Sequence, residues 1–199
     1  MLHVDWAVKD PKWRSRMLDT LDRLGEARSR NGNWPSTCGE QGDHLVHFCH
    51  GAPGMVWLYC KAFSVFGDQR FLDYATAAAQ TVWQYGILRK GPGLCHGVAG
   101  NGYALLEMFR ATGDSLWLAR AKHFASRMLA KDVVDASRTP DSQWSLFEGL
   151  AGTLCFLLDL RSSPSAAALP LFDPRASFGV PAGALADGGP GRKRRGAAE

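Results

Sequence analysis

The chain has 199 residues, of which 46% are hydrophobic and 21% are charged, which is the balance of a soluble globular protein with a sizeable core. The net charge is only +4, so the dense basic face of a nucleic-acid-binding domain is not expected. No apolar run is long enough to span a membrane, and the first residues lack the pattern of a secretory signal. The five cysteines are an odd number, which favours reduced thiols and a cytoplasmic location.

Two compositions divide the chain. Residues 1–162 contain all seven tryptophans, whereas 20 of the 37 residues in 163–199 are alanine, glycine or proline. We therefore predict a folded domain over 1–162 and a disordered tail over 163–199, because the tail holds too little apolar area to offset chain entropy. The tail contains the basic run 192–195, which is a solvated cluster, a nuclear address or a weak contact with an anionic surface such as the plasma membrane.

Three helices are predicted in the first half of the chain. The first covers about residues 11–24 and is assigned to an outer layer. Residues 55–66 are apolar nearly all round, which predicts a helix that is buried on most of its faces. Gly67 and Asp68 suit a left-handed helix end and the cap of the next helix. That helix covers about 70–85, and its apolar residues form one stripe, so we expect it to be half exposed.

A motif ahead of the buried helix recurs after 46 residues. The string at 49–54 reads Cys-His-Gly-Ala-Pro-Gly, and the string at 95–100 reads Cys-His-Gly-Val-Ala-Gly. The match continues without a gap, which predicts a second pair of buried and amphipathic helices. The string Glu-Gly-Leu-Ala-Gly at 148–152 is a third, partial copy, and it precedes a last buried helix at about 153–160.

Buried inner helices that alternate with amphipathic outer helices predict an all-α fold of helical-hairpin repeats, an α/α toroid of which this chain forms a partial ring. No strand-like alternation is long enough to compete. The glycine-rich strings lie at the N-termini of the inner helices, which point towards one mouth of such a ring. Five polar or ionisable side chains are expected to gather at that mouth: Cys49, His50, Cys95, His96 and Glu148.

Two Cys-His pairs at one mouth predict a zinc site, because thiolate and imidazole are the usual ligands of Zn²⁺. Two structural alternatives remain open: the cysteines are small buried apolar residues, or both pairs form a closed four-ligand site. The repetition favours zinc, and the residues alone do not say which histidine binds it. Glu148 is either a catalytic residue or an acid that stabilises a helix N-terminus.

The combination of these motifs resembles the lanthionine synthetase C-like (LanC-like) proteins, which are eukaryotic relatives of the bacterial lanthipeptide cyclases. The resemblance covers about residues 4–160 and assigns residues 1–162 to the C-terminal half of the family's domain. Six segments carry it: His47–Gly54, Gly93–Gly97, Ser145–Gly152, Asn31–Pro35, Val82–Gly86 and Arg138–Asp141.

The resemblance implies an α/α toroid of seven helical hairpins around one zinc ion. The family's zinc ligands correspond to Cys49, Cys95 and His96, so His50 is expected to support a ligand or to contact substrate instead. Three protein ligands leave a fourth position open, as in catalytic zinc sites.

The open position would take the thiol of a cysteine or of glutathione, which adds to a dehydroamino acid in a peptide or protein to give a thioether. The family's glutathione-contacting lysine and arginine correspond to Lys90 and Arg138, whose positive charges suit carboxylates. The alternative for each is an ordinary surface charge.

The chain also departs from the family pattern. The upstream His-Gly-Leu-Ala-Gly motif, whose histidine protonates the enolate, is absent, so we expect this chain alone to be inactive. A partial ring exposes apolar faces of its inner helices and lacks polar caps at its end hairpins, so we also expect the chain to be unstable or self-associating. A non-catalytic zinc-binding or adaptor module is the alternative function. A sugar-processing toroid is a third possibility, for which Asp141 and Glu148 are the only nearby carboxylate pair.

Overall fold

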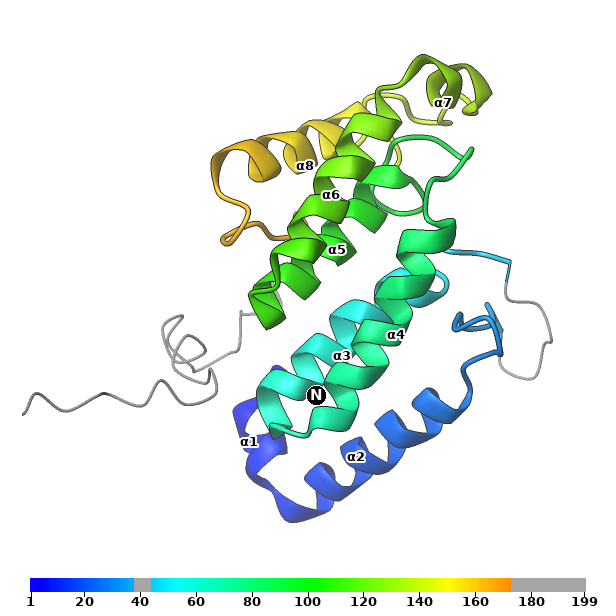
Figure 1. Cartoon of the computed structure of the whole chain (residues 1–199). Coiled ribbons are helices and arrows are strands. Elements are labelled where there is room, and N and C mark those ends of the chain that lie inside the picture. The colour runs from blue at the N-terminus through cyan, green and yellow to red at the C-terminus, as the bar shows by residue number, and fades with distance from the viewer. Residues whose placement is uncertain (38–43, 173–199) are drawn as a thin grey trace, which may run out of the picture.

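The structure is a computed structural model and describes residues 1–37 and 44–172. The described part contains eight α-helices and no strand beyond an isolated bridge between Leu169 and Phe172, so the predicted all-α class is confirmed (Figure 1). The helices are α1 (Asp5–Lys9), α2 (Pro11–Glu26), α3 (Ala52–Phe66), α4 (Gln69–Tyr85), α5 (Val98–Thr112), α6 (Ser115–Met128), α7 (Lys131–Ala136) and α8 (Leu150–Ser162).

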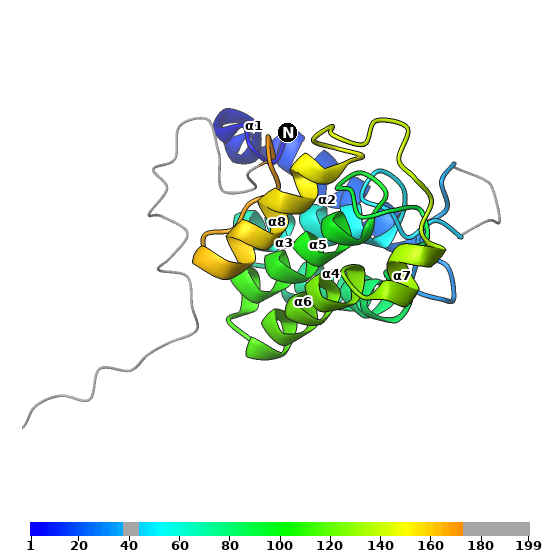
Figure 2. The ribbon, with the colours of Figure 1, turned by 90° about the horizontal axis from the view of Figure 1, so that it is seen from above.

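The helices pack as successive hairpins. Helix α3 packs most extensively against α4 and α5 against α6, while α3 contacts α5 and α5 contacts α8 (Figure 1). Seen from above, α4 and α6 form one layer and α3 and α5 the next (Figure 2). Burial follows this division, because α5 is buried over most of its length and α4 and α6 are buried along a stripe. The chain therefore forms the predicted arc of inner and outer helices, a part of an α/α toroid.

The inner helices begin earlier than we predicted. Helix α3 starts at Ala52 instead of Met55, so Gly54 lies inside the first helical turn. A Cβ atom on this glycine, or on its equivalents in the other two repeats, would lie between 1.8 and 2.5 Å from a backbone carbonyl oxygen of the preceding loop. The glycines are Gly54, Gly100 and Gly152, and the oxygens belong to Phe48, Leu94 and Leu146. The glycines thus let each loop fold back onto its own helix.

The boundary between inner and outer helices is formed as predicted. Gly67 and Gly113 end α3 and α5 with φ angles of 67° and 71°, in the left-handed region that favours glycine. The carboxylate of Asp68 then accepts a hydrogen bond from the Arg70 backbone N–H, and Asp114 caps α6 in the same way.

The packed region extends ten residues past the boundary that we placed at 162. Ala167 and Leu169 are buried, and the Phe172 ring lies edge-on against Trp57 of α3, with 5.9 Å between the ring centroids. The Arg110 guanidinium of α5 also donates a hydrogen bond to the Ala167 carbonyl. Composition suggested disorder, but these few apolar residues meet a surface that α3 and α5 already form.

The rest of the predicted tail, including the basic run 192–195, lies outside the described residues. Within the described part, no helix is long and apolar enough to cross a membrane. The short helices α1 and α7 are absent from the sequence-based prediction, since five or six residues are too few to show a helical period.

Candidate metal centre

The loops that precede the three inner helices lie side by side. The Cys49 backbone N–H donates to the Cys95 carbonyl, with 3.3 Å between nitrogen and oxygen. The backbone N–H groups of Leu94 and Cys95 both donate to the Phe147 carbonyl at 2.8 Å. Each loop is therefore held by the equivalent loop of the next repeat, which brings the two Cys-His pairs to one place.

Three of the expected residues meet in a cluster that can bind a metal ion. The ligand atoms of Cys49, Cys95 and His96 all lie within 4.8 Å of one another. Two sulfur donors and one imidazole are a donor set that suits Zn²⁺, whose bonds to such atoms are about 2.0–2.3 Å long. The cluster answers a question that the residues alone left open, because His96, and not His50, is the histidine within reach.

The Cys49 thiol of the cluster holds its proton tightly. Burial and the neighbouring Cys95 thiol raise the pKa of Cys49 to about 12, although the residue as a whole is exposed. At neutral pH this sulfur therefore carries a proton that a metal ion must displace, since the thiolate is the form that binds metal.

His47 is a site residue that the sequence did not identify. It is 8% exposed, and its ring lies 5.9 Å from the ring of His96, measured between centroids. Its burial, followed by the proximity of His96, lowers the pKa of His47 to about 4, so the imidazole is neutral at physiological pH. The repeat gives no signal for this residue, because the equivalent position in the second repeat is Gly93.

Two buried asparagines hold the loop that carries Cys49. The Asn33 side-chain oxygen accepts from the Ala52 backbone N–H at 2.7 Å, and its amide donates to the Leu45 carbonyl at 3.0 Å. The Asn101 amide of α5 donates to the carbonyls of Val46 and Gly86, both at 2.9 Å. Neither role was predicted, since both asparagines act on segments distant in sequence.

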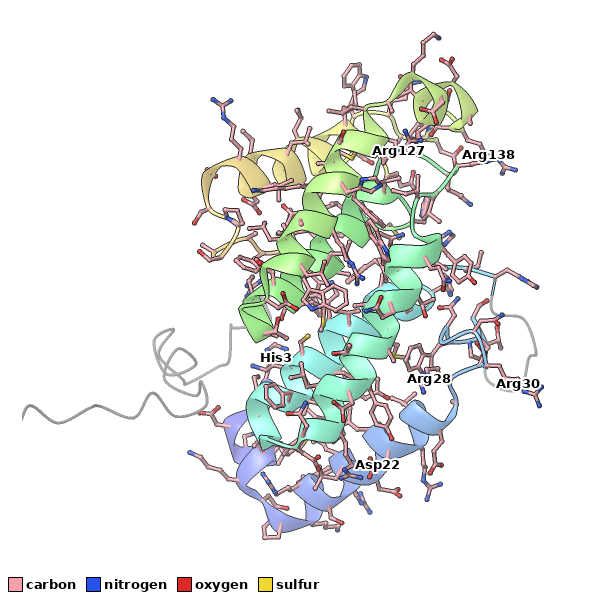
Figure 3. All side chains as sticks on the ribbon, viewed as in Figure 1. His3, Asp22, Arg28, Arg30, Arg127 and Arg138 are labelled. Carbon is pink, nitrogen blue, oxygen red and sulfur yellow. The ribbon has the colours of Figure 1, made fainter. Side chains whose placement is uncertain are left out.

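The two cations expected to contact glutathione lie on adjoining segments. The Arg138 backbone N–H donates to the Arg89 carbonyl at 2.8 Å, which places Arg138 beside the segment that contains Lys90. Lys90 is close enough to the cluster to lower the pKa of both His47 and Cys49. Arg138 is exposed on the side of the molecule where the loops before α3 and α5 lie (Figure 3), at the edge of a cavity of about 330 Å³.

His50 and Glu148 lie beside the cluster without belonging to it. His50 is exposed, and its backbone exchanges hydrogen bonds with that of His47 at 2.9 and 3.2 Å. Glu148 is half-buried, and its backbone lies directly against Gly93, the residue two positions before Cys95. Within the described part of the chain, neither side chain joins a metal-ligand group.

Comparisons with known proteins agree with this architecture. A sequence model of the lanthionine synthetase C-like proteins matches residues 1–172. The chain is 43% identical over 159 residues to the glutathione S-transferase LANCL1 of Danio rerio, an alignment that covers 80% of this chain and 39% of that protein. It is 42% identical over 168 residues to the LanC-like protein GCL1 of Arabidopsis thaliana, which covers 81% of this chain and 38% of that protein.

The chain thus spans about two fifths of the length of these two relatives. The family match includes the two loops of the metal cluster, and it extends through the packed segment that follows α8 to Phe172. On the strength of this match, the chain belongs to the lanthionine synthetase C-like protein family.

Proposed function

We propose that this chain is a zinc-binding and glutathione-binding protein, and that its complete form adds the glutathione thiol to dehydroamino acids in peptides or proteins. The convergence of Cys49, Cys95 and His96 is the observation that carries the proposal. The similarity to a protein named as a glutathione S-transferase supports glutathione as the thiol.

Each residue of the site has a separate role in this proposal. Cys49, Cys95 and His96 would hold the ion, and Lys90 and Arg138 would pair with the glutathione carboxylates. An ion held by these residues would lower the pKa of the glutathione thiol, so that a thiolate would be available at neutral pH. In the addition, the sulfur bonds to the β-carbon, the carbon–carbon π bond breaks, and a proton is delivered to the α-carbon.

The proton delivery is the step for which this chain offers no matching residue. No string in its sequence corresponds to the family's His-Gly-Leu-Ala-Gly motif. We therefore propose that the 199-residue chain binds zinc and glutathione but does not catalyse the addition by itself. Incubation with glutathione and a dehydroalanine peptide should give no product above the uncatalysed background by mass spectrometry, and a thioether product formed by this chain would contradict the proposal.

Zinc content of the purified chain tests the metal site. We expect about one zinc ion per chain and loss of that ion in Cys95→Ala, since removing one of three ligands weakens a site strongly. Cys155→Ala is the matched control, because Cys155 lies in α8 outside the cluster. A purified chain without zinc after supplementation with the metal would refute the proposal.

Measurements of glutathione binding test the proposed roles of Lys90 and Arg138. The double variant of Lys90→Ala and Arg138→Ala should weaken glutathione binding by roughly tenfold or more, since each charge-assisted hydrogen bond contributes about 1.5–3 kcal/mol. Arg161→Ala removes an exposed cation from the end of α8 and should leave the affinity unchanged. A chain that binds zinc but no glutathione would favour the alternative of a non-catalytic adaptor module.

The proposed location is the cytoplasm, with peripheral contact at the plasma membrane. The four cysteines in the described residues are all free, which suits a reducing compartment. The basic run 192–195 supports a weak attraction to anionic lipid. Sedimentation with phosphatidylserine vesicles should fall when these four residues are replaced by glutamine.

A further inference from the structure

His47 and His96 occupy a contact that the repeat makes at both joints between its loops. At the joint between the second and third loops, a Cβ atom on Gly93 would lie 2.4 Å from the Glu148 carbonyl oxygen, so the two backbones are in direct contact. The repeat equivalents of Gly93 and Glu148 at the first joint are His47 and His96. At the first joint, a pair of imidazole rings therefore takes the place of a contact between backbones.

His47 belongs to the most firmly held part of the first loop. The carbonyl of Leu45 accepts a hydrogen bond from the Asn33 amide at 3.0 Å. The carbonyl of Val46 accepts one from the Asn101 amide at 2.9 Å. Both asparagines are buried, and His47 itself is only 8% exposed. A residue anchored in this way is suited to fix the direction of a neighbouring side chain.

His96 is a side chain whose direction needs to be fixed. A histidine that binds a metal ion through one ring nitrogen usually donates the N–H of its other nitrogen to an acceptor, which orients the ring. The His96 ring makes no hydrogen bond to another described residue. The His47 ring lies beside it, with 5.9 Å between the ring centroids and 50° between the ring planes. Burial favours the uncharged form of His47, in which one nitrogen is free to accept.

We propose that His47 is a positioning residue of the metal centre, which accepts a hydrogen bond from one ring nitrogen of His96, directly or through one water molecule, and so holds the other nitrogen towards Cys49 and Cys95. His47 does not bind the ion in this arrangement. A water-mediated hydrogen bond is nearly as favourable as a direct one, so either path serves this purpose. The inference rests on the proposed zinc site and adds a residue to it.

The two other polar side chains beside the cluster fit this role less well. His50 is exposed, so its ring is not held in one direction by its surroundings. Glu148 is half-buried, but its loop contacts the second loop at Gly93, three residues before His96. The buried ring of His47 is the one that faces the His96 ring.

The proposed role also couples the two loops of the metal centre. Cys49 lies on the first loop, two residues after His47, and Cys95 lies on the second loop, next to His96. The backbones of the two loops are joined by the hydrogen bond from the Cys49 N–H to the Cys95 carbonyl at 3.3 Å. A hydrogen bond between the two imidazoles adds a link at the level of the side chains, so that the ligands of both loops keep one arrangement.

Zinc affinity, measured by competition with a chelator, tests the role of His47. His47→Phe keeps an aromatic ring and removes both ring nitrogens. We expect it to weaken zinc binding about 10–100-fold, the loss that is typical when the partner of a metal-binding histidine is removed. His47→Gln retains an acceptor oxygen and should keep more of the affinity than His47→Phe. His44→Phe is the matched control, because His44 is exposed on the same loop, and its affinity should equal that of the wild type.

Co²⁺ bound in place of zinc gives a second readout that does not depend on activity. The visible absorption bands of the bound Co²⁺ should shift in His47→Phe, because the orientation of the His96 ring changes, and should stay unchanged in His44→Phe. A residue that only fills space would leave these bands in place when another ring replaces it. Far-ultraviolet circular dichroism checks that each variant is helical, and His47→Leu takes the place of His47→Phe if the latter does not fold.

The possible results separate this inference from the proposed function. A wild-type chain that binds no zinc refutes the proposed function itself. If the wild type binds zinc and His47→Phe binds it equally well, only the role of His47 is wrong. Equal losses in His47→Phe and His47→Gln would show that the acceptor atom does not matter. A loss in His50→Phe or Glu148→Gln, with none in His47→Phe, would assign the role to one of those residues.

Discussion

At the mouth of the arc, two histidine rings lie against each other and only one of them belongs to the metal cluster. His96 is within reach of the two thiols, whereas His47 is enclosed behind it. The burial of His47 disfavours its charged form, and the neighbouring His96 and Lys90 add to the effect, which lowers its pKa from 6.5 to about 4. Between about pH 4 and pH 6.5, the His47 imidazole therefore stays neutral in the folded chain and is protonated in the unfolded chain.

This difference makes the stability of the metal-free chain depend on pH. The stabilisation is fully present above about pH 6.5, the pKa of His47 in the unfolded chain. It is lost as the pH falls towards 4, the pKa of His47 in the folded chain. Urea unfolding of the metal-free chain should give a lower free energy of unfolding at about pH 4.5 than at about pH 7.5. In His47→Gln this difference between the two pH values should be smaller by on the order of 1 kcal/mol. The exposed His44 provides the control His44→Gln. Equal pH dependence in the wild type and in His47→Gln would show that His47 is not responsible.

At the scale of the element, each loop of the candidate metal centre is tied to the first turn of the inner helix that follows it. The tie consists of a glycine that lets a loop carbonyl approach where any side chain would collide. Gly100 is the tightest example, because a Cβ atom there would be 1.8 Å from the Leu94 carbonyl oxygen, immediately before Cys95. The position of the cysteine therefore depends on the absence of a side chain five residues later.

Gly100→Ala should lower the free energy of unfolding by at least about 3 kcal/mol, since the new methyl group meets backbone that cannot move without moving the loop. Gly113→Ala is the matched control. Gly113 has a left-handed φ of 71° but open space around it, so the cost should be only about 1 kcal/mol. Urea denaturation measures both values, and similar losses in the two variants would contradict the importance of the close approach. Gly100→Ala should also lower the zinc content.

At the scale of the whole molecule, the chain returns across its own arc after α8. The segment from 163 to 172 joins α5 through Arg110 and the Ala167 carbonyl, and α3 through Phe172 and Trp57. These contacts add to the direct packing of α3 against α5 and to the hydrogen bonds between the loops of the two repeats. The folded unit in the described residues therefore reaches Phe172.

Two leucines of this segment, two positions apart, test its contribution. Leu169 is 1% exposed and Leu171 is 87% exposed. Leu169→Ala should destabilise the chain by about 2–4 kcal/mol, because a fully buried leucine leaves a cavity when it is truncated. Leu171→Ala should change the stability by less than about 0.5 kcal/mol. If urea denaturation gave a negligible loss for Leu169→Ala, the segment would not contribute to the folded unit.

Local patterns were sufficient to predict the long helices of this protein. The long apolar run of α3, the stripe of α4 and the Gly-Asp boundaries at 67–68 and 113–114 all act within a few residues, so helices and their order could be predicted. Short helices such as α7 could not be predicted, because six residues are too few to show a helical period. The packed segment after α8 could not be predicted either, because it depends on surfaces that distant parts of the chain provide.

The candidate metal centre, too, could be predicted from the sequence only in part. The repeated Cys-His pairs were enough to predict a metal site at the N-termini of the inner helices, since the spacing of the repeat places the loops together. The residues by themselves did not distinguish His50 from His96, because two adjacent side chains differ only in direction, and the path of the loop decides that direction. His47 and Asn101 were missed because their partners are close in space but carry no pattern in the chain.

By itself, the sequence determined an all-α arc of helical hairpins with thiols and imidazoles at one mouth, since these features follow from periodicity and repetition. Only the tertiary structure decided that Cys49, Cys95 and His96 form the cluster and that His47 is enclosed behind it. It also decided that Ala167 and Leu169, which the composition assigned to a disordered tail, are buried. The physical reason is that burial and direction are properties of a side chain's neighbours, and those neighbours are set by packing between repeats.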